Sequence, residues 1–354
     1  MSHNVSKAYN DLPPLPPKCD LESPSILKGV IEAQRELAEL KAVGLMLPNL
    51  GVLIQAIALQ EAKVSSEIEN VVTTNDALFQ SVADEGKSGD PYTKEVYRYH
   101  EALWFGFEAI TQKKRLLSSH LFEQIAEKIT GNQGGIRKLP GTQLKSATGK
   151  VIYIPPEGEG VIREHLEHLV HFIYQESRFD PLVRMALVHY QFEAIHPFYD
   201  GNGRTGRILN LLHLVHEKIL EYPILYLSHY IIDHRSHYYA ALNSVTTSGS
   251  WEAWVLYMLR AVAETARGTK QRIVAILKLM KETEKKIPRK IYSEELLEML
   301  FEHPYCKIKF LARKWHRQTA AHYLRELEKA GILTCVKKGR ELYYIFDDYI
   351  KLLS

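Results

Sequence analysis

Apolar residues recur every three or four positions along most of the chain, which is the period of an amphipathic helix. The segments with this pattern are residues 31–45, 50–64, 96–117, 120–129, 161–175, 181–195, 204–220, 236–245 and 251–280. Residues 1–24 lack the pattern, and the four prolines between positions 13 and 17 favour an extended N-terminal lead-in. The sequence therefore predicts a mainly α domain over residues 25–285.

One stretch, residues 134–156, interrupts the helical pattern. Glycines and prolines punctuate it, and residues 151–154 form a short β-branched and aromatic run. This combination is typical of a β-hairpin. We expect a hairpin that forms a surface flap on the helical domain.

The last part of the chain has a pattern of its own. A charged segment at residues 281–290, either a linker or the end of a helix, precedes helical segments at residues 308–313 and 318–329. Gly331 then stops the second helix, and two β-type runs follow at residues 332–336 and 342–346. This order of elements predicts a small winged helix-turn-helix domain over residues 286–354.

Composition, charge and cysteine count exclude several classes of partner and cellular compartment. The chain has 354 residues, of which 45% are hydrophobic and 25% charged, and its net charge of +3 gives no global attraction to nucleic acid or membrane. Its three cysteines are widely separated, which fits neither a disulfide framework nor a zinc site. No apolar run is long enough to span a bilayer, and the N-terminus lacks the apolar core of a signal peptide. We expect a cytoplasmic protein with no membrane partner.

Residues 196–207 read HPFYDGNGRTGR and combine features of a phosphate-binding site. Pro197 prevents the preceding helix from continuing, so a glycine-rich loop opens the next one. The first backbone N–H groups of a helix have no partner within it and attract an anion, here beside Gly201 and Gly203. Arg204 and Arg207 share one face of the first turns and suit a polyphosphate.

Two further side chains of this segment suit phosphate chemistry. Asp200 offers a hard oxygen ligand of the kind that Mg²⁺ uses beside phosphates. His196 can act as a base near neutral pH. Each residue alone is more often an ordinary loop residue or a member of an ion pair, but their coincidence within twelve positions favours a nucleotide site.

This segment resembles the signature of the Fic family, H-P-F-x-[D/E]-G-N-G-R-x-x-R, at every fixed position. The order and spacing of the predicted elements over residues 25–285 are similar to the family as well. The resemblance implies a Fic-type helical domain that uses ATP and Mg²⁺ to transfer AMP to a Ser, Thr or Tyr hydroxyl of a target protein, releasing pyrophosphate. Family members that act as kinases carry Lys where this sequence has Gly203, so the resemblance favours AMP transfer.

The resemblance also implies a role for individual residues. His196 would take the proton from the target hydroxyl, Asp200 would hold Mg²⁺ between phosphates, and Phe198 would anchor the loop. The residues that would bind the phosphates of ATP are Gly201, Asn202, Gly203, Arg204, Thr205, Gly206 and Arg207, with Asn202 at the α-phosphate and both arginines at the β- and γ-phosphates. Tyr239 lies in a region that resembles the one in contact with the nucleoside.

A second motif lies at the end of the helix predicted to start near residue 50. Ser65 and Glu69 are four positions apart and therefore face the same way. With Asn70 they resemble the family's inhibitory motif, [S/T]-x-x-x-E-[G/N], on a helix over about residues 50–70. The resemblance implies that Glu69 pairs with Arg207 and takes the place of the γ-phosphate. The same glutamate could also serve the removal of AMP from modified proteins, which stays an alternative.

Protein and nucleic-acid partners are suggested by two regions. The flap over residues 134–156 resembles the surface on which the family docks its targets by main-chain hydrogen bonds. In residues 305–345, ten basic and three acidic side chains leave a local charge of +7. Residues 317–319 would begin a recognition helix, and Lys337, Lys338 and Arg340 would lie on the wing, facing DNA.

Further alternatives remain open beside the adenylyltransferase hypothesis. The site could transfer a different nucleotidyl group in place of AMP. The C-terminal domain could serve protein contacts or a homodimer in place of DNA. The whole chain could be a DNA-binding regulator whose Fic-like domain only senses a nucleotide, although a sensor would need phosphate-binding residues but not the base His196. Self-modification is also compatible with the sequence, and nothing in it identifies the target protein.

Overall fold

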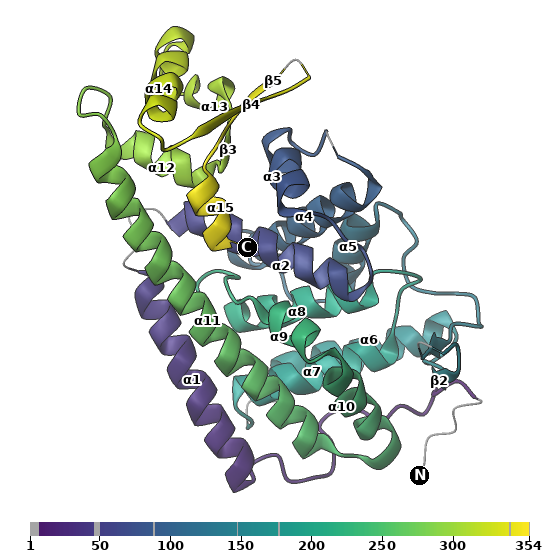
Figure 1. The fold of residues 1–354 in the computed structure, drawn as a ribbon. Coiled ribbons are helices and arrows are strands. Elements are labelled where there is room, and N and C mark those ends of the chain that lie inside the picture. The colour runs from purple at the N-terminus through teal and green to yellow at the C-terminus, as the bar shows by residue number, and fades with distance from the viewer. Residues whose placement is uncertain are drawn as a thin grey trace.

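The computed structural model describes residues 7–45, 50–87, 89–146, 148–175, 178–339 and 341–353. It is mainly helical, as predicted (Figure 1). The helices before the hairpin are α1 (Pro24–Gly44), α2 (Leu50–Ile68), α3 (Asn75–Ala83), α4 (Pro91–Thr111) and α5 (Ser119–Thr130). After the hairpin follow α6 (Glu159–Gln175), α7 (Pro181–Ile195), α8 (Asn202–His216), α9 (Leu227–Asp233), α10 (Arg235–Ser248) and α11 (Trp251–Lys286).

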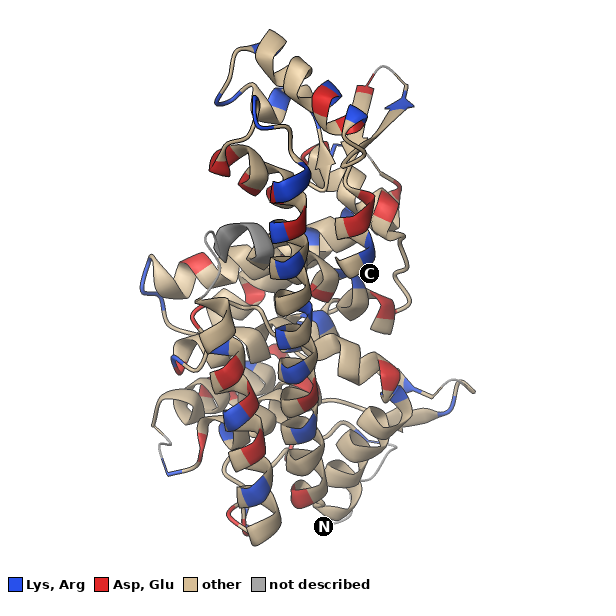
Figure 2. Cartoon of the chain, turned by 60° about the vertical axis from the view of Figure 1, so that its left-hand side comes forward, with Lys and Arg blue, Asp and Glu red and all other residues tan. Residues whose placement is uncertain are grey.

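Helices α1 and α11 lie side by side along one edge of the molecule (Figure 1). Helix α11 has 36 residues and is therefore about 54 Å long. Gly29 allows the close approach, because a Cβ there would lie 3.1 Å from Leu259 Cδ1. Acidic and basic positions occur along both helices (Figure 2). The buried Glu36 carboxylate accepts hydrogen bonds from Arg267 and Lys270. The two long helices thus pack along their lengths and form one side of the molecule.

Helix α7 lies at the centre of the helical domain and packs against α6, α8 and α11. Almost all of its residues are buried, among them the polar side chains of Arg184, His189 and Gln191. Helix α8 is similarly buried and crosses between α4, α5 and α7. The junction between α7 and α8, which holds residues 196–201, is therefore anchored in packed helices, while Tyr199 and Asp200 within it are exposed.

The predicted flap is a short hairpin of β1 (Leu144–Lys145) and β2 (Val151–Tyr153), paired antiparallel. The extended lead-in runs beside it, since the Tyr9 N–H donates to the Ile154 carbonyl at 3.0 Å (Figure 1). The Tyr9 and Tyr153 rings also meet edge to face, with their centroids 6.3 Å apart. Residues 1–6 of the predicted lead-in lie outside the described residues.

The C-terminal module contains the two helices and the two strands that the sequence predicted, in the predicted order, and its assignment as a winged helix-turn-helix domain stays a prediction. Its elements are α12 (Glu294–Glu302), β3 (Tyr305–Cys306), α13 (Ile308–Leu311), α14 (Arg317–Lys329), β4 (Thr334–Lys338), β5 (Glu341–Ile345) and α15 (Asp347–Leu353). The strands form an antiparallel sheet in the order β3-β5-β4. The module packs on α2, α3 and α11 (Figure 1).

The structure differs from the sequence prediction mainly at the ends of helices and in short elements. Helix α1 begins at Pro24 because the Ser23 hydroxyl caps it, and α4 begins at Pro91 because Asp90 caps it. Helix α11 continues to Lys286, so the charged segment is the end of a helix. Periodicity did not reveal α3, α9 and α15, which have nine residues or fewer and span too few turns for a clear period.

Candidate active site

Helix α7 delivers His196 to the site. The helix ends at Ile195, and the His196 N–H still donates to the Phe192 carbonyl at 3.0 Å. His196 itself has φ 48° and ψ 59°, a left-handed conformation that is uncommon for a residue other than glycine. This conformation turns the chain sharply from α7 into the loop that leads to α8.

The loop between His196 and α8 is held by one side chain. The Asn202 amide donates to the Phe198 carbonyl at 2.7 Å and accepts from the Phe198 N–H at 2.8 Å. Both residues are buried, and Phe198 anchors the loop in the core. Gly201, with φ 80°, supplies the turn into α8. In this structure the Asn202 amide is engaged by the loop, and its contact with an α-phosphate remains a prediction.

The start of α8 is open to an anion. No side chain caps this helix, so the amides of its first turn lack a side-chain acceptor. The Glu69 carboxylate reaches this place, since a Cβ on Gly203 would collide with Glu69 Oε1 and would lie 2.9 Å from Arg207 Nη1. Glycine at position 203 therefore allows an anion to approach the helix closely.

Arg207 binds the predicted inhibitory segment. Its Nε donates to Ser65 Oγ at 2.8 Å, and its Nη2 donates to the Ser65 carbonyl at 2.8 Å and to Glu69 Oε1 at 2.9 Å. Burial opposes the charge on both partners, but their attraction prevails: it raises the pKa of Arg207 above its usual range and lowers the pKa of Glu69. Asn70 ends this segment with φ 64°, which explains the choice between Gly and Asn at this position of the motif.

Arg204 and Asp200 form the other side of the loop. Arg204 is buried and donates to Glu95 of α4 and, at 3.1 Å, to Asp200 Oδ1. The Asp200 side chain is 70% exposed, so one hard oxygen ligand stays accessible beside the anion site. The described residues contain no cluster of three or more side chains suited to a metal. Mg²⁺ therefore fits this site only if the phosphates supply further ligands, which is its usual way of binding.

The His196 ring is held in the neutral state. Loss of hydration lowers its pKa to about 4, and the Arg137 guanidinium acts in the same direction. Glu69, the Glu193 backbone and Asp200 act in the opposite direction. A neutral imidazole at pH 7 can accept a proton, and bound phosphates would raise its pKa because their negative charge favours the imidazolium.

Tyr239 lies close to the inhibitory segment. It is exposed on α10, and burial of its hydroxyl together with the charge of Glu69 raises its pKa. The Arg235 guanidinium lies 5.9 Å from the centre of its ring and donates to the Ile68 carbonyl at 2.7 Å. The structure thus brings Tyr239 near Glu69, and its contact with a nucleoside remains a prediction.

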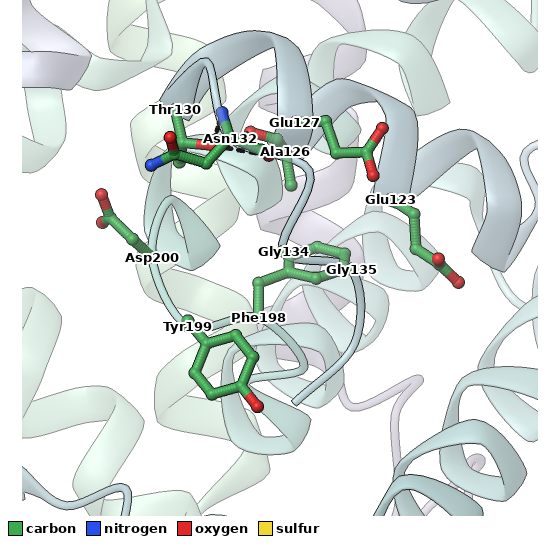
Figure 3. Close-up of a pocket in the computed structure, with 10 residues that line it drawn as sticks. All are labelled: Glu123, Ala126, Glu127, Thr130, Asn132, Gly134, Gly135, Phe198, Tyr199 and Asp200. Atoms are coloured by element: carbon green, nitrogen blue, oxygen red, sulfur yellow. Dashed lines mark hydrogen bonds between the residues drawn. The ribbon is translucent and has the colours of Figure 1, made fainter. Parts of the chain in front are cut away.

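A hollow on the far side of the loop separates it from α5 (Figure 3). Tyr199 and Asp200 lie at one rim, Glu123 and Glu127 of α5 lie opposite, and the flap begins at Gly134 and Gly135 (Figure 3). The Tyr199 hydroxyl accepts hydrogen bonds from the N–H groups of residues 138 and 139, at 3.0 and 3.3 Å. The loop and the base of the flap are therefore joined.

Sequence reasoning missed several residues that support the site. Glu61 is fully buried on α2, where it accepts hydrogen bonds from the Ser228 N–H at 3.0 Å and from the Ser228 hydroxyl. Burial raises its pKa to about 7. The available signal was the acidic residue Glu61 among the apolar residues of a predicted helix. Its partner Ser228 is 167 positions away, so the sequence alone could not identify the contact. Arg137 and Glu95 were missed for the same reason.

The basic residues assigned to DNA are partly engaged elsewhere. Lys307 pairs with Asp84, Lys309 pairs with Glu85 at 3.2 Å, and Lys338 pairs with Asp76 at 2.7 Å. Other residues of the predicted interface, Arg317 and Gln318 among them, are exposed at the start of α14, whereas Arg340 lies outside the described residues. DNA binding by residues 305–345 remains a prediction. No helix among the described residues is long and apolar enough to cross a membrane.

Sequence comparison places these features among known proteins. Residues 27–108 match the model described as Fic/DOC family N-terminal, and residues 111–214 match the Fic/DOC family model. Residues 277–349 match the C-terminal domain of SoFic-like protein adenylyltransferases. The protein adenylyltransferase fic-1 of Caenorhabditis briggsae is 30% identical over 159 residues, 44% of this chain and 28% of the relative. The protein adenylyltransferase fic-1 of Caenorhabditis elegans is 32% identical over 132 residues, which are 37% of this chain and 23% of that relative.

The match to these curated relatives spans about a quarter of their length. The fold is similar over a longer stretch. A Fic family protein from Desulfovibrio desulfuricans has a TM-score of 0.62 at 21% identity, covering 93% of this chain and 98% of that one. A fragment of C. elegans Fic-1 has a TM-score of 0.56 at 22% identity, and the match covers 73% of this chain and 75% of that one. With three consecutive domain matches and the complete signature at residues 196–207, this chain belongs to the Fic/DOC family.

Proposed function

We propose that the chain is a protein adenylyltransferase that Glu69 holds in an inhibited state. The observation that carries the proposal is the position of the Glu69 carboxylate at the open start of α8, bound to Arg207. A carboxylate there occupies a place built for a phosphate. The names of the relatives support the same activity.

The proposed reaction forms one bond and breaks another. The oxygen of a target hydroxyl attacks the α-phosphorus of ATP, and the oxygen that bridges the α- and β-phosphorus atoms leaves with pyrophosphate. The hydroxyl proton passes to the neutral ring of His196. The amides at the start of α8, with Arg204 and Arg207, would hold the phosphates in place, so catalysis rests on positioning and charge.

Asp200 is the residue that would hold Mg²⁺, since its exposed carboxylate lies beside the anion site. When bound, the ion would offset the negative charge of the phosphates and of the departing pyrophosphate. In the structure Arg204 bonds to Asp200 and Glu95. These bonds use two of the five N–H donors of the guanidinium, so Arg204 can bind a phosphate with its other donors while it keeps both partners.

Inhibition follows from competition for Arg207. Glu69 Oε1 and a terminal phosphate cannot both lie against Gly203 and Arg207, so ATP would bind with its α-phosphate misplaced. Such a charge-assisted bond contributes about 1.5–3 kcal/mol. Its removal should therefore raise the transfer rate about 10- to 100-fold.

The proposal is tested with ATP labelled at the α- or the γ-phosphate, in the presence of Mg²⁺ and a lysate as the source of targets. We expect protein-bound label only from the α position, 10- to 100-fold more with Glu69→Gly and none with Glu69→Gly/His196→Ala. The control is Glu67→Gly, which makes the same change two positions earlier, in the last turn of α2, at a residue that forms no bond to Arg207.

Each contrary result has a definite meaning. Label from the γ position would show phosphorylation instead. Equal labelling by wild type and Glu69→Gly would remove the inhibitory role of Glu69. If neither phosphate labels any protein, release of AMP from a modified lysate would indicate the reverse activity, and its absence would favour a nucleotide sensor.

A further inference from the structure

The flap begins with an arginine whose partners are unusual. Arg137 is 1% exposed, and within the described part of the chain its guanidinium donates to backbone carbonyls. Its Nε donates to the His196 carbonyl at 2.7 Å, and its Nη2 donates to the Pro156 carbonyl at 2.9 Å and to the Ile195 carbonyl at 3.4 Å. Among the described residues no carboxylate lies within ion-pair distance of this cation, and Glu157 supports its charge only from farther away, so its burial is costly.

Two of these carbonyls belong to the end of α7, where helix carbonyls lack partners within the helix. A simple capping role would explain the bond to Ile195. The shorter bond, to the C-cap residue His196, does more than cap the helix, because it also fixes the peptide that follows the left-handed residue. Because the direction of the imidazole depends on the backbone angles of His196, this bond controls where the base points.

The same residue joins the flap to the loop. The Arg137 N–H donates to the Pro197 carbonyl at 2.9 Å, and Ile136 forms an isolated β-bridge with Phe198. The bond to Pro156 reaches the other end of the flap. The start of the flap, its end and the backbone of His196 therefore meet at one guanidinium.

We propose that Arg137 is a positioning residue for His196: it fixes the left-handed backbone of the base and couples it to both ends of the flap. This inference rests on the proposed function for its catalytic meaning, but its structural part stands by itself. The target docked on the flap and the base that deprotonates it would thus keep one relative position.

Electrostatics supply an independent measure of this contact. The charged groups that face His196 are Arg137 from the flap base, Glu69 from the segment after α2, and Asp200 from the loop. Of these only Arg137 lowers the pKa of the imidazole. Loss of its charge must therefore raise the pKa of His196, whether or not the chain transfers AMP.

The test compares Arg137→Gln with Arg184→Gln, both in the Glu69→Gly background. Arg184 is the control, because it is also a buried arginine that donates to a backbone carbonyl, that of Ile173 at 3.2 Å, but it lies near the other end of α7 and also pairs with Glu217 at 2.6 Å. The readouts are kcat and KM for ATP in AMP transfer and the pKa of His196 from histidine-labelled NMR, assigned with His196→Ala.

We expect Arg137→Gln to lower kcat about 10- to 100-fold, as a small misplacement of a catalytic group does, with KM for ATP changed less than about threefold. The pKa of His196 should rise. Arg184→Gln should change neither quantity, even if it lowers the melting temperature. An unchanged kcat and an unchanged His196 pKa in Arg137→Gln, or equal losses in both variants, would overturn the inference.

Two provisions keep the result decisive. If Arg137→Gln does not fold, Arg137→Lys takes its place, because it keeps the charge but not the planar guanidinium that reaches several carbonyls. The pKa of His196 should then stay low while kcat falls. Full activity of Arg137→Lys would show that the guanidinium geometry is not needed. If the Glu69→Gly parent transfers no AMP, the proposed function fails, and the NMR comparison alone decides whether Arg137 acts on His196.

Discussion

Gly203 and Glu69 show how closely single residues define this site. A side chain at position 203 would collide with the Glu69 carboxylate, and one at Gly206 would collide with Glu193, so both glycines of the first turns leave room for acidic groups. Asn202, between the loop and α8, uses its donor and its acceptor on Phe198. The shape of the anion site therefore depends on small residues and one amide as much as on the arginines.

Replacing Asn202 by Asp tests the role of this amide in the loop. A carboxylate cannot donate to the Phe198 carbonyl and would lie against it in a buried place, so we expect a loss of about 1–3 kcal/mol in the free energy of unfolding at pH 8. Burial against the Phe198 carbonyl should raise the pKa of this Asp above its usual range, so the loss should shrink as the pH falls to 5, because a protonated Asp can donate again. Urea unfolding of wild type and variant at pH 8 and pH 5 measures both losses in the free energy of unfolding. Asn243→Asp, at an exposed position on α10, should change stability by less than about 0.5 kcal/mol; a similar loss there would contradict the assignment.

Helix α2 carries the inhibitory segment and is bound at successive turns of one face. Glu61 binds Ser228 of α9, Ser65 binds Arg207 of α8, and the carbonyl of Ile68 binds Arg235 of α10. Three different helices of the Fic domain therefore hold α2 in register with the anion site. Its position depends on polar contacts that a change of pH or of sequence can alter.

Glu61→Gln tests the most deeply buried of these contacts. The pKa of Glu61 is about 7 in the folded chain and about 4.3 in an unfolded one, so the folded state holds the proton more tightly. Wild type should therefore lose stability as the pH rises from 5 to 8, by up to about 1.4 kcal/mol per unit from this group. The variant lacks this ionisation, so its stability relative to wild type should increase over the same range. Parallel stability curves in urea from pH 5 to 8 would show that Glu61 does not titrate there.

At the scale of the whole molecule, the apolar period of the sequence predicted the long helices. The signature at residues 196–207 predicted a glycine-rich loop that leads into a helix. The spacing of Ser65 and Glu69 also predicted a shared face, and both residues do meet Arg207. Contacts such as Arg137 with His196 could not be predicted, because hydrogen bonds between segments 59 positions apart leave no periodic pattern. The pairing of the basic C-terminal face with α3 was missed because α3 itself was too short to recognise.

That pairing joins the C-terminal module to the rest of the chain and gives a last prediction. Lys307 is 5% exposed and pairs with Asp84, which also accepts the Tyr343 hydroxyl at 3.0 Å, whereas the Asp76 partner of Lys338 is 59% exposed. Asp84→Asn leaves a buried ammonium with Glu341 as its remaining acidic partner, so we expect a loss of about 1–3 kcal/mol in the free energy of unfolding. Asp76→Asn should cost about 0–1 kcal/mol, and less in high salt, because water already screens that pair. Equal losses in urea unfolding would mean that burial does not distinguish the two pairs and that Asp84 does not dominate the docking of the module.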